Sequence, residues 1–97
     1  MNNDLVEFAE NHSELFMNVT RDLLKRKRIN KELDIKSSPK EIAKELIKVL
    51  KIERLSNNQL EARYGLRDTL GGRFICYTYL IKENNSLDLI SEEKIVC

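Results

Sequence analysis

The sequence predicts an α+β fold in which two N-terminal helices pack on one face of a three- to four-stranded antiparallel sheet, a β-meander. Apolar residues recur at helical spacing up to residue 50, they alternate after it, and Asn-Asn pairs separate the alternating segments. The chain has 97 residues, so we expect a single domain over 1–97. Its helical half is 4–50 and its sheet half is 51–97.

The spacing of apolar residues predicts a single amphipathic helix over residues 4–28. Apolar side chains recur there at three- and four-residue steps, and Asp4 followed by Glu7 resembles a capping box. Asn11 followed by Glu14 offers a second helix start, which would divide the segment in two. We favour one helix, because the apolar stripe crosses Asn11 without losing phase.

A second helix is predicted after a connector at 29–37. Ser38 can accept a hydrogen bond from a first-turn amide, and Pro39 has no N–H to leave unpaired at the first helical position. Glu41 completes the start signal because it can reach back to the cap. The apolar stripe behind these residues predicts a helix that continues to about residue 50.

The sheet half begins with a predicted hairpin at Asn57-Asn58, because asparagine tolerates the positive φ of tight turns. Residues 73–82 are the clearest strand, since they are rich in β-branched and aromatic side chains. A second Asn-Asn turn follows at 83–86. The tail up to Cys97 is expected either to continue as one strand or to form an added edge.

Both faces of the strand at 73–82 are apolar, and this predicts a partner. Two helices can cover only one face of a small sheet, so we expect a second copy of this chain or another protein to bury the other face. The alternative is that tyrosines tolerate exposure and part of this face is solvated. We assign the partner interface to the face that carries Ile75, Tyr77, Tyr79 and Ile81.

The charge is unevenly distributed, with ten basic and four acidic residues between 25 and 51. Adjacent cations can contact a phosphate backbone. Alternatively, cations at a helix C-terminus are favoured by the helix dipole, and the remaining lysines form a solvated face. The glycine-rich connection at 65–73 contains two arginines. Their guanidinium groups, together with backbone N–H groups of the connection, can bind an anion. The predicted nucleic-acid or anion-binding residues are Lys25, Arg26, Lys27, Arg28, Lys40, Lys44, Lys48, Arg67 and Arg73.

The sequence predicts a non-enzymatic binding or regulatory protein without a cofactor or a metal. His12 is the only histidine, and neither cysteine lies in a ligand cluster. Two isolated cysteines indicate a reduced, cytoplasmic chain, and no apolar run is long enough for a membrane span. The leading hypothesis is a homodimer whose basic helical surface contacts nucleic acid. The alternative is a protein–protein interaction module that acts through the apolar sheet face.

Overall fold

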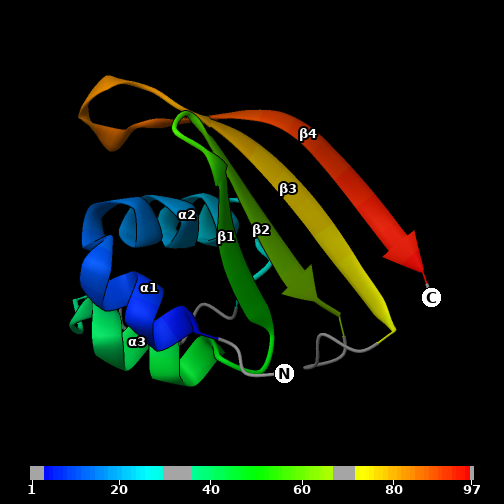
Figure 1. Ribbon diagram of the computed structural model, residues 1–97. Helices are drawn as coiled ribbons and strands as arrows, with labels where there is room; N and C mark the ends of the chain where they lie inside the picture. The colour runs from blue at the N-terminus through cyan, green and yellow to red at the C-terminus, as the bar shows by residue number, and fades with distance from the viewer. Residues whose placement is uncertain (1–3, 30–35, 67–71, 97) are drawn as a thin grey trace.

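The computed structural model describes residues 4–29, 36–66 and 72–96. The strands form one antiparallel sheet in the order β1-β2-β3-β4, and the three helices lie on the same side of it (Figure 1). The predicted α+β meander is therefore confirmed. The elements are α1 Leu5–Asn11, α2 Ser13–Lys25, α3 Pro39–Leu46, β1 Leu50–Ser56, β2 Gln59–Gly65, β3 Arg73–Ile81, the 3-10 turn η1 Glu83–Asn85 and β4 Leu87–Val96.

The prediction of a single helix over 4–28 is wrong, because the helix is interrupted at His12. His12 adopts φ −136° and ψ 56°, which is outside the helical region. Its N–H still donates to Phe8 O (2.7 Å), and its carbonyl accepts from Phe16 N–H (2.9 Å). His12 is therefore both the C-cap of α1 and the N-cap of α2. The break lets α1 turn away from α2 and pack on α3, where Leu5 and Ala9 are buried.

The predicted start of the second helix is confirmed in α3. The Ser38 side-chain oxygen accepts the N–H of Glu41 (3.3 Å), and Pro39 occupies the first turn. The helix ends at Leu46 and not near residue 50, because Leu50 already belongs to β1 and pairs with Tyr64 of β2. Leu50 is fully buried from its position on the strand, which explains why the apolar stripe extends past the end of the helix.

Helix α2 ends on a left-handed residue that is not glycine. Lys27 has φ 61°. Its N–H donates to Leu24 O (2.9 Å), and the N–H of Arg28 donates to Leu23 O (2.9 Å). These two bonds form a Schellman motif, in which glycine normally takes the left-handed position. The reversal directs Arg28 towards the sheet and brings Ile29, which is 4 % exposed, into the core.

The core lies between the three helices and the inner face of the sheet. On β3, Ile75, Tyr77 and Tyr79 point towards the helices and are 2, 0 and 1 % exposed. Leu60 and Ala62 of β2 lie opposite the two tyrosines and are also fully buried. Alternate residues of the same strands therefore point to the outer face.

Among the described strands, β4 lies at an edge of the sheet and pairs with β3 alone, and it contains a β-bulge. Thr78 pairs with Ser91 while the next residue, Tyr79, pairs with Leu89, so Ile90 has no counterpart on β3. The side chain of Ile90 is half exposed. Because of the bulge, Leu89 before it points to the inner face with Tyr79, whereas Ser91 after it points to the outer face with Thr78.

We expect Lys27→Gly to raise the free energy of unfolding by about 1 kcal/mol, because glycine adopts the left-handed conformation without a Cβ clash. Urea denaturation measures the change. Lys25→Gly is the matched control, since it removes the same side chain from the last turn of α2 and should lower stability by about 1 kcal/mol. Shifts of the same sign in both variants would contradict this account of Lys27.

Candidate functional site

Two of the four adjacent cations that end α2 bind side chains of this chain. Arg28 Nε donates to the Tyr77 hydroxyl (2.8 Å), and its guanidinium lies 3.6 Å from the Glu92 carboxylate. Arg26 Nε donates to Asp22 Oδ2 (2.8 Å), and its guanidinium lies 6.0 Å from the centroid of the Tyr77 ring. Arg28 therefore connects the end of α2 to β3 and β4, and Arg26 lies against the Tyr77 ring of β3. Both guanidinium groups thus bind side chains of this chain.

The second tyrosine of β3 is held from the same helix. The Tyr79 hydroxyl donates to Asp22 Oδ2 (2.6 Å), the oxygen that also accepts from Arg26. Burial, and then the Asp22 hydrogen bond, raise the pKa of Tyr79 far above its usual value. Burial also raises the pKa of Tyr77, against the opposing effect of Arg28. Both phenols therefore remain protonated at neutral pH and serve the packing of α2 on the sheet.

The assignment of the partner interface to Ile75, Tyr77, Tyr79 and Ile81 is wrong, because this is the face that the helices cover. The first three residues are buried, and Ile81 packs against the core from the end of the strand. The tyrosines are placed inside because their hydroxyls find charged partners on and just after α2. Alternation in the sequence defined two faces without showing which of them the helices would take.

The two lysines of the basic cluster differ from its arginines. Lys25 and Lys27 are exposed at the end of α2, and neither makes an ion pair with any residue in the described part of the chain. Arg21, one turn before Lys25, is exposed and donates to the side chain of Asn18 (3.2 Å). The positive charge available at this end of α2 is thus smaller than the sequence predicts.

The other predicted basic residues are distributed over the surface. Lys40 Nζ lies 4.0 Å from a Glu10 carboxylate oxygen, and Lys44 Nζ lies 3.6 Å from a Glu41 oxygen. All four side chains are more than half exposed, so these pairs contribute little to stability. Of the remaining three, Lys48 is exposed after α3 and Arg73 is exposed at the start of β3. Arg67 lies outside the described residues.

The outer face of the sheet is covered by no described helix (Figure 1). On this face the inner strand β3 presents the residues that alternate with the buried tyrosines: Phe74, Cys76, Thr78 and Leu80. Cys76 is only 8 % exposed and has a free thiol. Burial, and then the neighbouring Glu61 carboxylate, raise the pKa of this thiol to about 11. Cys76 is therefore a protonated packing group and not an activated nucleophile.

Side chains on this outer face are ordered by one another. Arg63 Nε donates to Glu61 Oε1 (2.9 Å), and the Arg63 guanidinium lies 5.6 Å from the centroid of the Phe74 ring. The Glu61 side chain is 16 % exposed although no described helix covers it. The face therefore has a fixed pattern of polar and apolar groups before any partner binds.

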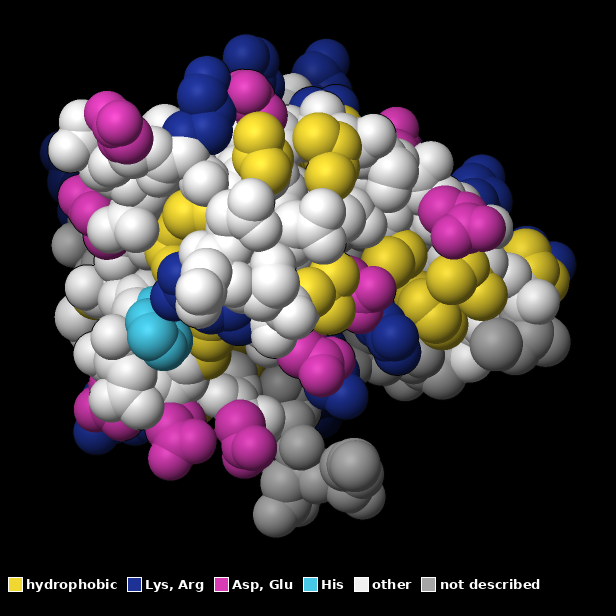
Figure 2. Space-filling view, turned by 45° about the horizontal axis from the view of Figure 1, so that its top comes forward, with side chains coloured by type: hydrophobic (Ala, Val, Ile, Leu, Met, Phe, Trp, Pro, Cys, Tyr) yellow, Lys and Arg dark blue, Asp and Glu magenta, His cyan; other side chains and the backbone are white. Residues whose placement is uncertain are grey.

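Acidic residues predominate on the outer face. Figure 2, turned by 45° from Figure 1 so that the top comes forward, shows hydrophobic side chains interspersed with acidic and basic ones. A negative face repels phosphate groups. The outward charged residues of the four strands are the bases Lys51 and Arg63 and the acids Glu53, Glu61, Asp88 and Glu93.

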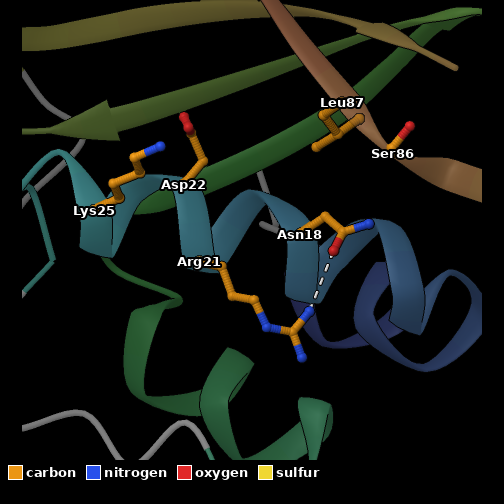
Figure 3. A pocket seen from close by; sticks show the side chains of 6 residues that line it. All are labelled: Asn18, Arg21, Asp22, Lys25, Ser86 and Leu87. Atoms are coloured by element: carbon orange, nitrogen blue, oxygen red, sulfur yellow. Dashed lines mark hydrogen bonds between the residues drawn. The ribbon is translucent and has the colours of Figure 1, made fainter.

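A groove of about 270 Å³ lies between α2 and the start of β4 (Figure 3). Figure 3 shows Arg21 running along α2 to Asn18 and away from β4. Asn18 Nδ2 in turn donates to Asn85 O (2.8 Å), and Asp22 is engaged by Tyr79 and Arg26. Arg21, Asn18 and Asp22 are therefore already hydrogen-bonded within this chain. The groove is lined by Asn18, Arg21, Asp22, Lys25, Ser86 and Leu87.

The only histidine, His12, is exposed at the junction of α1 and α2, with its ring 5.0 Å from that of Phe8. Within residues 4–29, 36–66 and 72–96, no group of three or more His, Cys, Asp or Glu side chains is placed to hold a metal ion. In the same part of the chain, no helix has both the length and the apolar character needed to cross a bilayer.

Comparisons with known proteins gave no relative: no family model, no curated protein and no solved structure matches this chain significantly. The candidate surfaces therefore rest on the geometry described above. They are the outer sheet face and the exposed Lys25 and Lys27 at the C-terminal end of α2.

We expect Tyr79→Phe to lower the free energy of unfolding by about 1.5–3 kcal/mol, the range for a hydrogen bond to a charged group. Chemical denaturation at neutral pH measures the loss. In an Asp22→Ala background the same substitution should have a much smaller effect, because the acceptor is already absent. Equal losses in the two backgrounds would show that the hydroxyl does not act through Asp22.

The stability of the protein should fall above about pH 10, the usual pKa of tyrosine. The folded-state pKa of Tyr79 is raised, so the unfolded chain loses this proton first. The resulting stabilisation is complete below the unfolded pKa and is lost as the pH rises towards the folded one. Tyr79→Phe should make the alkaline decline shallower, by up to about 1.4 kcal/mol per pH unit. Parallel pH profiles of the two proteins would contradict this.

Proposed function

We propose that this chain is a small non-enzymatic binding protein that docks another protein chain through the outer face of its sheet. The observation that carries the proposal is the inner strand β3, which is apolar on both faces but has helices on only one. A strand of this kind is typical of a sheet buried on both sides. Phe74 and Leu80 would form the apolar part of the docking surface.

The polar part of the outer face also favours a protein partner. Arg63 is already oriented by Glu61 and Phe74, so little side-chain freedom remains to be lost on binding. Arginine and aromatic side chains are enriched at protein interfaces. The excess of acids on this face disfavours nucleic acid there.

The free thiol of Cys76 is compatible with a reducing environment. Cys76 is the one cysteine among the described residues, and it is buried. Free thiols are usual where disulfides do not form, so we propose that the protein acts in the cytoplasm.

A photo-reactive amino acid in place of Thr78, at the centre of the outer face, tests this function in living cells. We expect a small number of discrete protein adducts on irradiation, because the face is covered by a partner. Adding Leu80→Lys should remove these adducts by placing a charge in the apolar contact. The same photo-reactive residue at position 44, on exposed α3, is the control. Identical adducts from positions 78 and 44, or none from position 78, would reject the function.

A second candidate function is weak polyanion binding at the end of α2. Lys25 and Lys27 favour it, since both are exposed and neither has an ionic partner among the described residues. Arg26 and Arg28 are engaged with Asp22 and Tyr77 and would contribute less. Binding at this site would be independent of the sheet face.

We expect a Lys25→Gln, Lys27→Gln variant to bind a nucleic-acid duplex more weakly and with a shallower salt dependence. The slope of log affinity against log salt should fall in magnitude by about 2, because two phosphate contacts are lost. Fluorescence anisotropy over a salt series measures the slope. Lys40→Gln with Lys44→Gln removes the same charge elsewhere and serves as the control. No wild-type binding at low salt would reject this candidate.

A further inference from the structure

We propose that the chain docked on the outer face is a second copy of this protein, packed face to face about a two-fold axis that runs across the strands. This inference rests on the proposed function and names the partner of the same surface. An axis in this direction lays each strand over its own counterpart and reverses the strand direction. The two sheets then pack in the aligned manner of a β-sandwich.

The register of the sheet arranges the outward side chains in rows. On β1 and β2 one row is basic and the adjacent row is acidic, two residues and about 6.6 Å further along the strands. The first row holds Lys51, Arg63, Cys76 and Glu93, and the adjacent row holds Glu53, Glu61, Thr78 and Ser91.

A two-fold axis between these rows makes the surface complementary to itself. Lys51 then faces Glu53 of the second copy, and Arg63 faces Glu61 of the second copy. Symmetry repeats each contact, so the interface holds four oppositely charged pairs and opposes no like charges within these two rows. Cys76, next to Arg63 on the other inner strand, faces the uncharged Thr78 of the second copy.

The same axis also matches the apolar residues. Phe74 lies one row beyond Arg63 and Cys76, and Leu80 lies one row beyond Glu61 and Thr78. The rotation places Phe74 of each copy over Leu80 of the other. Two apolar contacts therefore flank the charged centre, and both involve side chains that are half-buried before association.

An axis parallel to the strands gives a poorer match. It lays β1 over β4 and β2 over β3 of the second copy. Lys51 would face Glu93, but Arg63 would face Cys76, and Phe74 would face the strand-end Gly65. The acids of the second row, such as Glu61, would receive no base. Charge complementarity thus selects the axis that crosses the strands.

The size of the face sets the strength of the association. Four strands about 4.8 Å apart and about seven residues long make a face of roughly 19 Å by 23 Å, or about 440 Å² per copy. An interface of this size is at the low end for specific complexes. We therefore expect a reversible dimer whose population depends on protein concentration.

Charge reversal tests the arrangement. In both symmetric contacts of the dimer, Lys51→Glu places an acid against Glu53 of the other copy, and Glu53→Lys places a base against Lys51 of the other copy. We expect each variant alone to dimerise at least about tenfold more weakly than the wild type. An equimolar mixture of the two should form a dimer of one copy of each, because every facing pair is then oppositely charged. Sedimentation velocity over about 1 µM to 1 mM measures the states.

Lys44→Glu and Glu41→Lys are the matched controls, since they reverse the same charges on exposed α3 and should leave dimerisation unchanged alone and mixed. Recovery in the mixture also shows that the single variants are folded. A wild type that stays monomeric throughout, or single variants that dimerise normally, would overturn the proposal. So would recovery on combining Lys51→Glu with Glu93→Lys in one chain, which indicates the other axis.

The photo-crosslinking experiment separates this inference from the proposed function. An adduct at position 78 with the mass of two copies supports both. Discrete adducts with a different protein and none with a second copy would retain the function and overturn the homodimer. No discrete adduct would reject both.

Discussion

The attachment of α2 to β3 is the interaction on which the rest of the structure depends. The hydroxyls of Tyr77 and Tyr79 are buried beneath the helices, and each has a charged partner: Arg28 and Asp22, respectively. A buried hydroxyl without a partner is strongly destabilising, so these hydrogen bonds fix which face of the sheet the helices cover. The outer face, and every binding surface proposed for it, is a consequence of that choice.

Local sequence signals predicted the elements that short-range chemistry controls. The hairpin at Asn57-Asn58 and the Ser38 cap form at the expected places, because each needs only neighbouring residues. The positive φ expected for this turn is found instead at Asn84 and Asn85 of the second Asn-Asn turn. The break at His12 was indicated by the Asn11 and Glu14 start signal but rejected in favour of one helix, and the end of α3 at Leu46 was missed. At both boundaries the apolar residues before and after the helix end pack into the same core. The spacing of apolar residues therefore does not reveal where the helix ends.

The candidate site was predicted in part. Alternation in β3 correctly gave two apolar faces and only one covered by helices, but the face was misassigned because tertiary hydrogen bonds of the tyrosines decide it. The sequence held one signal for the arginines: Asp22 lies four residues before Arg26, a spacing that favours an internal ion pair. The outer pattern of Glu61, Arg63 and Phe74 needed the register of the sheet before it became visible.

The bulge at Ile90 has a consequence for how copies of this chain can assemble. A long, regular edge strand is an open template on which further strands can add without limit, as in amyloid. In β4 the extra residue disturbs the spacing of the unpaired backbone groups, and the charged residues Glu92, Glu93 and Lys94 come after Ser91, the next residue. Addition of further strands at this edge is therefore disfavoured, and the β4 side of the sheet is protected from fibril growth.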